Sequence, residues 1–200
     1  DGTISITINP VNDAPVLSDA FADGLSFNEG SFFSGSLGWS DVDDIDLVQT
    51  ISGGNNITVS GGDNIFTFES YTDWYGSEIF TISISDGELS DSQVFTVTVI
   101  PMNDDPVLTV DGTITFDEDS SGSLSFVTSD VDGDSITTSI IDCPLGNNEG
   151  VSVNISENTL NFVSIPDYNG SLACFTLIAN DGTTSISSDI NVTVNPVNDA

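Results

Sequence analysis

Apolar and polar residues alternate strictly over several short stretches of the chain. A clear example is Phe95-Thr96-Val97-Thr98-Val99, which is matched near the C-terminus by Ile190-Asn191-Val192-Thr193-Val194. A period of two places one set of side chains on a core and the other in water, as in a half-buried β-strand. Similar runs, bounded by Gly, Asn and Asp, recur along the chain without a long helical pattern between them. The pattern therefore predicts an all-β protein.

The predicted strands fall into two series. The first series covers residues 24–28, 32–39, 47–52, 56–60, 64–69, 78–85 and 92–100, and the second covers residues 112–117, 123–128, 135–141, 151–155, 159–164, 172–179 and 184–194. About seven short antiparallel strands in each series indicate tandem β-sandwiches with immunoglobulin-like Greek-key topology. The side chains expected to point into the two cores are Phe80, Ile82, Ile84, Phe95, Val97 and Val99, and then Phe175, Leu177, Ala179, Ile190, Val192 and Val194.

A proline-bounded segment marks the ends of these two series. Asn-Pro-Val-Asn-Asp-Ala-Pro at residues 9–15 recurs as Pro-Met-Asn-Asp-Asp-Pro at 101–106 and as Asn-Pro-Val-Asn-Asp-Ala at 195–200. Proline fixes φ and cannot extend a central strand, so these segments are predicted to be stiff hinges between repeated domains. The expected repeats are residues 15–105 and 106–200, the second with its trailing hinge. Residues 1–14 would hold the last strand and the hinge of a preceding repeat, because residues 3–8 alternate like the other last strands.

The charge of the chain limits its partners. It has 32 Asp and Glu residues and no Lys, Arg or His, which gives a formal net charge of -32. Nucleic acid and direct membrane binding are excluded, since both depend on Lys and Arg. His and Lys bases are also missing, so we expect no enzyme activity. Solubility in a salty medium is an alternative explanation for the scattered carboxylates.

Acidic and amide side chains gather at equivalent positions of both repeats. They lie near the first predicted strand (Glu29 and Glu118), after the second (Asp41, Asp43, Asp130, Asp132 and Asp134), between the fifth and sixth (Asp73 and Asp167), before the last (Asp86 and Asp181), and in the hinges (Asn12, Asp13, Asn103, Asp104, Asn198 and Asp199). Neighbouring strands of such a sandwich run in opposite directions, so acids from adjacent repeats should converge on the hinge between them. Calcium takes roughly 6 to 8 oxygen ligands, which this convergence would supply. A tight turn alone is the alternative for the Asp-Gly pairs.

These motifs resemble the calcium-binding signature of cadherin repeats, and more closely that of bacterial cadherin-like repeats from large surface adhesins. They are Phe116-Asp117-Glu118-Asp119, Asp130-Val131-Asp132-Gly133-Asp134, residues 166–170, Asn180-Asp181-Gly182 and the hinge. The resemblance implies Ca2+ bound by the acidic and amide residues of the hinges and corners. It also implies a calcium-rigidified structural or adhesive module of an extracellular or cell-surface protein. Its partners would be the neighbouring repeats, and a homophilic or glycan partner on another cell.

The two cysteines lie in the second repeat. Cys143 stands in a loop, residues 142–150, that is longer than its counterpart in the first repeat, and Cys174 takes the strand position of Ile79. A disulfide between Cys143 and Cys174 that staples this loop is the prediction. Two unpaired thiols in a reducing compartment are the alternative.

Aromatic side chains suggest a second function. Trp39, Trp74, Tyr75 and Tyr168 could serve as stacking platforms in a glycan- or ligand-binding module whose acidity is incidental. Trp74 and Tyr168 occupy equivalent positions in the two repeats, which favours a packing role at that corner.

Overall fold

The computed structural model describes residues 2–198, except residues 19, 20, 22, 44, 63, 145 and 147. This part of the chain contains strands and turns but no helix, which confirms the predicted all-β class. The chain divides into two compact units, residues 1–102 and 103–200. The predicted metal ligand Asp199 lies outside the described residues.

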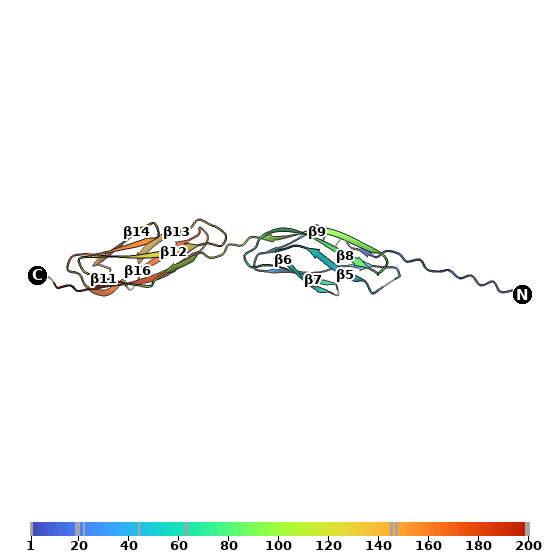
Figure 1. The fold of residues 1–200 in the computed structure, drawn as a ribbon, viewed down its shortest axis with the longest axis horizontal. Coiled ribbons are helices and arrows are strands. Elements are labelled where there is room, and N and C mark those ends of the chain that lie inside the picture. Colours follow the sequence, from blue (N-terminus) through green and yellow to red (C-terminus); the bar gives the residue numbers. More distant parts are fainter. Residues whose placement is uncertain are drawn as a thin grey trace. The chain divides into compact units, whose positions relative to one another are not determined.

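The first unit packs two sheets face to face (Figure 1). Its strands are β1 (Val16–Leu17), β2 (Leu25–Asn28), β3 (Phe32–Ser36), β4 (Trp39–Ser40), β5 (Val48–Gly53), β6 (Ile57–Gly62), β7 (Ile65–Ser70), β8 (Gly76–Ser85) and β9 (Ser90–Ile100). One sheet has the strand order β2-β9-β8-β5, and the other has the order β3-β7-β6. β1 and β4 form a short separate ladder.

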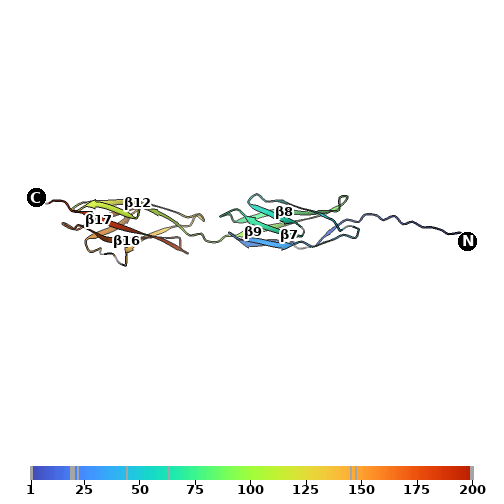
Figure 2. The same cartoon turned by 90° about the horizontal axis from the view of Figure 1, so that it is seen from below.

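The second unit repeats this arrangement, as Figure 1 and Figure 2 show from two sides. Its strands are β10 (Val107–Val110), β11 (Thr113–Asp117), β12 (Ser121–Ser129), β13 (Thr137–Asp142), β14 (Val151–Ser156), β15 (Thr159–Ser164), β16 (Gly170–Asn180) and β17 (Ser185–Asn195). The two sheets have the orders β10-β12-β15-β14 and β11-β17-β16-β13. This division of strands between two sheets is that of an immunoglobulin-like sandwich, so the predicted fold is confirmed.

The entry segment of each repeat is two short strands that serve different sheets. β10 pairs antiparallel with β12, whereas β11 pairs parallel with β17. In the first unit, β1 pairs with β4 and β2 pairs parallel with β9. The sequence predicted β2 and β11 but not β1 and β10, which directly follow Pro15 and Pro106.

The cores lie between the two sheets of each unit. All the side chains predicted to point inward from the last two strands are buried, and none is more than 4% exposed, so the alternation was interpreted correctly. In the first unit, Phe68 packs edge-on against Phe80 and Phe95, with ring centroids 5.7 and 5.8 Å apart. Such aromatic pairs each add about 0.5 to 1.5 kcal/mol beyond the burial of their area.

Residues 3–8 do not form the strand that their alternation predicts. They carry no strand assignment, and Ile4, Ile6 and Ile8 are all more than 80% exposed. A strand needs a neighbouring strand to accept and donate its ladder hydrogen bonds, and none of the described residues supplies one to this segment. Alternation therefore shows that a segment can form a strand, but the strand forms only beside a partner strand.

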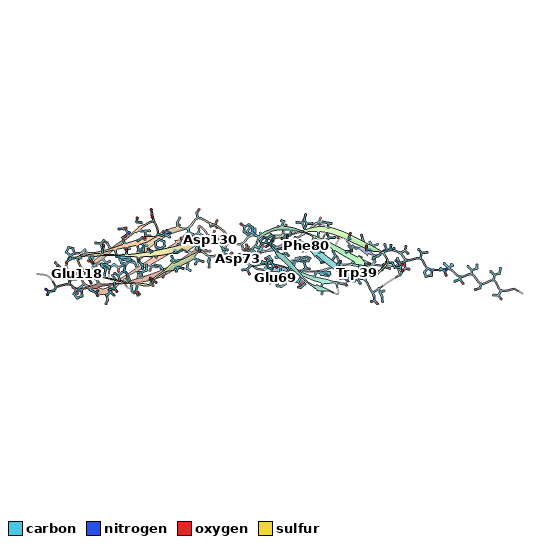
Figure 3. All side chains as sticks on the ribbon, viewed as in Figure 1. Trp39, Glu69, Asp73, Phe80, Glu118 and Asp130 are labelled. Atoms are coloured by element: carbon cyan, nitrogen blue, oxygen red, sulfur yellow. A yellow bond between two sulfur atoms is a disulfide. The ribbon has the colours of Figure 1, made fainter. Side chains whose placement is uncertain are left out.

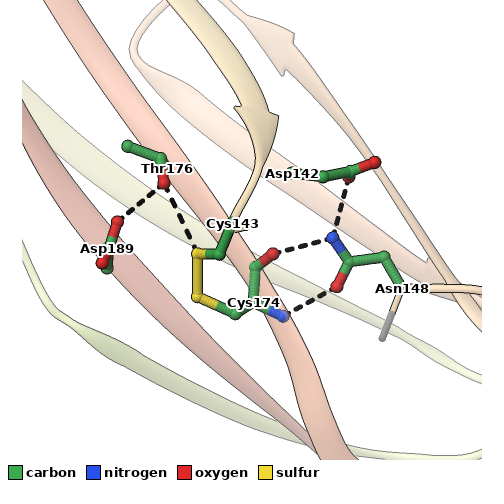
Figure 4. The surroundings of a disulfide bond; sticks show 6 residues. All are labelled: Asp142, Cys143, Asn148, Cys174, Thr176 and Asp189. Atoms are coloured by element: carbon green, nitrogen blue, oxygen red, sulfur yellow. Dashed lines mark hydrogen bonds between the residues drawn. A yellow bond between two sulfur atoms is a disulfide. The ribbon is translucent and has the colours of Figure 1, made fainter. Parts of the chain in front are cut away.

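The loop after β13 is held to β16 by a disulfide and by one amide side chain (Figure 4). Cys143 and Cys174 are bonded, with their Cα atoms 5.4 Å apart. Asn148 imitates a strand, since its Oδ1 accepts from the Cys174 amide at 2.8 Å and its Nδ2 donates to the Cys174 carbonyl at 2.7 Å. The loop therefore continues the edge of the sheet beyond β13.

The shorter loop after β5 in the first unit is held by a carboxylate instead. Glu78 on β8 accepts hydrogen bonds from the backbone amides of Asn55, Asn56 and Ile57, at 2.9 to 3.2 Å. Burial raises the pKa of the Glu78 carboxyl, but these donors outweigh that effect and lower the pKa overall. The loop is thus anchored to an ionised side chain.

Candidate metal centre

Each unit carries acidic groups at both of its ends. In the second unit, Asp130 and Glu118 lie at opposite ends of the sandwich (Figure 3). In the first unit, Asp73 lies at one end, and Trp39, two residues before Asp41, lies at the other. Within a unit, the aspartate corner (residues 130–134 or 41–43) and the turn before the last strand (at Asp181 or Asp86) lie at the end where the hinge enters. Convergence of acids from both repeats on one hinge stays a prediction.

The strongest candidate for a metal site is the corner formed by Asp130, Asp132 and Asp134. One carboxylate oxygen from each lies within 4.8 Å of the others. The corner turns around Asp130, whose Oδ1 accepts from the amides of Asp132 at 2.9 Å and Asp134 at 3.3 Å. Gly133 supports this turn with a φ of +81°.

Asp130 also has one oxygen that no described group satisfies. Its Oδ2 is buried and accepts no hydrogen bond. A buried polar atom without a partner costs about 1 to 3 kcal/mol, and the two neighbouring carboxylates add repulsion. Because the chain has no Lys, Arg or His, no side chain can offset that charge. The donor set is therefore one that a hard, oxygen-binding cation fits.

The first repeat has a similar corner. Asp41 Oδ1 accepts from the Asp43 amide at 2.7 Å, as Asp130 does from Asp132. The position of the third carboxylate, Asp134, is taken by Ile45 in the first repeat. The two corners therefore differ in sequence, and Asp44, at the position of Gly133, lies outside the described residues.

The hinge docks onto the corner that follows it in both units. The backbone amide of Asp104 donates to Asp132 Oδ2 at 2.8 Å, and that of Asp13 donates to Asp43 Oδ2 at 2.7 Å. The hinge residues Asn103 and Asp104 accordingly belong to the second compact unit.

The hinge asparagine docks onto the turn before the last strand. Asn103 Nδ2 donates to Asp181 Oδ2 at 3.0 Å, and Asn12 Nδ2 donates to Asp86 Oδ2 at 2.9 Å. The pKa of the Asp181 carboxyl lies well below its ordinary value, because the Thr184 amide and the Asn103 side chain donate to it. For Asp86, the Leu89 amide and the Asn12 side chain lower the pKa in the same way.

The opposite end of each unit uses a glutamate to hold the trailing hinge. Glu118 is buried, and its Oε1 accepts from the Val197 amide at 2.6 Å. Glu29 Oε2 accepts from the Met102 amide at 3.3 Å, while its Oε1 is buried and has no hydrogen-bond partner. Glu29 Oε1 is therefore a second orphaned oxygen that a cation would satisfy.

One amide at this end was not included in the predicted ligand set. Asn169 Nδ2 donates to Glu118 Oε2 at 3.1 Å. Asn169 belongs to the motif at residues 166–170, of which the predicted ligand set contains only Asp167. Asp167 and its counterpart Asp73 both adopt left-handed backbone, with φ of +60° and +55°. Of the hinge that follows, Asn198 lies within the described residues.

The aromatic side chains considered for glycan binding mostly pack against the cores. Trp39 and Trp74 are partly buried against the first core, and Tyr168 is partly buried against the second. Tyr75 is the one of the four that is classed as exposed, at 48%. This packing argues against a shared stacking platform.

Comparisons with known proteins give a family and several distant structural likenesses. The sequence model of a family described as "Bacterial Ig domain" matches residues 12–98 and 103–195. No match was found among curated protein sequences. The described residues contain no helix long and apolar enough to cross a membrane.

Three solved structures illustrate the structural likeness. The human desmocollin-1 ectodomain is 13% identical, with a TM-score of 0.46, over 93% of this chain and 41% of that one. The insect immune protein hemolin is 11% identical, with a TM-score of 0.49, over 90% and 47%. An endo-fucoidan hydrolase of glycoside hydrolase family 107 is 18% identical, with a TM-score of 0.40, over 96% and 30%. This chain therefore spans less than half the length of each.

Proposed function

Since the chain belongs to the bacterial Ig domain family, in two tandem copies, we propose that it is a calcium-stiffened repeat module of a large extracellular or cell-surface protein. The family is a non-catalytic repeat fold, and the proposed role is structural and adhesive. In this role, the repeats act as spacers that extend or mediate contact between cells.

The observation that carries the proposal is the orphaned oxygen of Asp130. Asp130 Oδ2 is buried without a hydrogen-bond partner. One carboxylate oxygen from each of Asp130, Asp132 and Asp134 lies within 4.8 Å of the other two. A calcium ion would supply positive charge and accept these oxygens as ligands, which removes both the unsatisfied atom and the repulsion.

Residues of the hinge contribute by fixing the backbone near this corner. Asp104 donates its amide to Asp132, so the hinge is already docked before any ion binds. An ion held by Asp130, Asp132 and Asp134 would therefore strengthen an existing contact between the hinge and the second repeat. Stiffening of the hinge would follow, because both sides of the contact would be fixed.

An extracellular location fits the chemistry of the second repeat. The Cys143–Cys174 disulfide is of a kind that persists in oxidising compartments. The net charge of -32 leaves cationic and neutral surfaces as attractive partners, in addition to neighbouring repeats. A neutral glycan on another cell is such a partner, whereas a second copy carries the same negative charge and would need cations between the two surfaces.

The test is calcium-dependent stability of the full 200-residue chain. Extracellular calcium modules bind with dissociation constants of about 0.1 to 1 mM, so 10 mM calcium should stabilise each site by about 1.4 to 2.7 kcal/mol. Melting curves with calcium and with a chelator should show this gain for the wild type. Asp130→Asn should lose it, while Asp111→Asn, a change at an exposed turn, should keep it. Identical curves with calcium and chelator would refute the proposal.

A further inference from the structure

Asp181 has no lone pair left for another ligand. Its Oδ1 accepts from the amides of Thr183 and Thr184, both at 2.6 Å. Its Oδ2 accepts from Thr184 Oγ1 and from Asn103 Nδ2, both at 3.0 Å. An ionised carboxylate offers about four lone-pair sites, and the Asp181 side chain, which is only 8% exposed, has four hydrogen bonds. Binding a cation would require breaking at least one of them.

The equivalent turn of the first repeat is built in the same way. Asp86 Oδ1 accepts from the amides of Glu88 and Leu89, both at 2.7 Å, and Asp86 Oδ2 accepts from Asn12 Nδ2 at 2.9 Å. Both repeats therefore use the aspartate before the last strand to close its own turn and to hold the hinge asparagine. Recurrence in both repeats indicates a built feature of the fold.

The hinge asparagine is consequently fixed in one orientation. Both Nδ2 hydrogens of Asn103 are used, one by Asp181 and one by the Asp104 carbonyl at 2.8 Å. Asn103 Oδ1 accepts no hydrogen bond from any described residue. The amide is therefore oriented with its nitrogen toward protein acceptors and its oxygen available.

We propose that Asp181 is a positioning residue that orients the hinge asparagine Asn103, as Asp86 orients Asn12, and that the free Oδ1 of Asn103 is one of the metal ligands. This inference rests on the proposed calcium function. It removes Asp181, whose four acceptor sites are filled, from the ligand set and keeps Asn103 and Asn12 in it. Asp86 accepts three hydrogen bonds and stays in the set. Partners that hydrogen-bond to metal ligands commonly change metal affinity by about 10- to 100-fold without touching the ion.

Terbium in place of calcium separates a ligand from a positioning residue. Luminescence lifetimes in H2O and D2O give the number of water molecules on the bound terbium. Asp181→Ala should lower terbium affinity by about 10-fold or more with an unchanged number of bound waters. The matched variant Asp134→Ala removes a proposed ligand and should add about one water. An added water in Asp181→Ala would overturn the proposal.

A second variant decides the question if Asp181→Ala does not fold. Asn103→Asp introduces a carboxylate at an exposed hinge position, so a count of ligand charges expects tighter terbium binding. Our proposal expects binding weaker by about 10-fold, because the new carboxylate cannot donate to Asp181 and is repelled by it. Tighter binding would contradict the proposal.

Hydrogen exchange of side-chain amides in the metal-free protein distinguishes the proposed calcium function from the positioning role of Asp181. The Asn103 side-chain NH2 protons should exchange slowly in the wild type and fast in Asp181→Ala, with Asn148 as an internal reference. If terbium does not bind to the wild type, the calcium function fails. If terbium binds but the Asn103 protons exchange freely in the wild type, only the positioning role fails.

Discussion

Glu78 and Cys174 stand one position apart on equivalent strands and perform the same task by different chemistry. Cys174 faces Asn191 across β16 and β17, as Ile79, the neighbour of Glu78, faces Thr96 across β8 and β9. Cys174 holds its loop by a covalent bond, whereas Glu78 holds the corresponding loop by accepting amide hydrogen bonds. The two repeats should therefore respond to different solution conditions.

Glu78→Gln should destabilise the first repeat by about 1 to 3 kcal/mol. Glutamine presents an NH2 group where the carboxylate now accepts from backbone amides, so at least one amide is left without a partner. Chemical denaturation followed by tryptophan fluorescence measures the effect, since Trp39 and Trp74 both lie in the first repeat. Glu69→Gln, at an exposed strand position, should change stability by less than about 0.5 kcal/mol.

The stability of the first repeat should fall as the pH falls into the acidic range. The pKa of Glu78 is lower in the folded state than its ordinary value, so its contribution is complete above the ordinary value. That contribution is lost as the pH drops through the lower folded-state pKa. Melting temperatures between pH 7 and pH 2 should show a smaller acid-induced drop for Glu78→Gln than for the wild type. Parallel curves would contradict this assignment.

Reduction of the disulfide should selectively destabilise the second repeat. The bond closes a loop with a sequence separation of 31 residues, which in the chain-entropy model stabilises by about 3 to 4 kcal/mol. Calorimetry with and without a reductant should show one transition moving to lower temperature. The transition of the first repeat is the internal control, because that repeat contains no cysteine.

Gly150→Ala should destabilise the second repeat by about 1 to 3 kcal/mol. A Cβ atom at Gly150 would lie 2.1 Å from the Tyr168 ring, so the ring would have to leave its place against the core. At Gly112 a Cβ atom would lie 3.5 Å from its nearest neighbour, so Gly112→Ala is the matched control. Equal stability of both variants would show that Tyr168 does not need its packed position.

Asp104→Ala should remove the calcium-dependent gain in stability without abolishing folding. The Asp104 amide that docks the hinge remains in the variant, while the hinge carboxylate that the sequence assigns to the ligand set is lost. Calcium titration of the melting temperature, with Asp111→Asn as the control, measures the effect. A full calcium response in Asp104→Ala would exclude its side chain from the site.

Period-two alternation was sufficient to predict the long strands and their buried faces. Val97 and Val192 point inward because their strands are long enough for the pattern to be unambiguous. β1 and β10, which directly follow Pro15 and Pro106, were not predicted. Residues 3–8 show the opposite error: they alternate and were predicted as a strand, but no described strand lies beside them to form a ladder.

The sequence indicated which acidic and amide residues lie near the hinge, but it could not show which of their oxygens are already hydrogen-bonded. The sequence placed Asp181 among the acidic groups near the hinge, and the structure brings Asp181 to Asn103. The backbone amides of Thr183 and Thr184 fill two of the four acceptor sites of Asp181. A sequence pattern does not show which backbone amides point toward a side chain. Conversely, the orphaned Asp130 Oδ2 is defined by its burial, which only the folded structure gives.

The parallel pairing of β11 with β17 has a mechanical consequence. β11 is the second of the two entry strands and β17 is the last strand of the sandwich, and they pair side by side from Thr113 with Asn191 to Asp117 with Asn195. A tensile load applied to the two ends of the repeat pulls the strands in opposite directions along their own axes. The interstrand hydrogen bonds are then sheared together instead of being peeled apart singly, so rupture requires a high force.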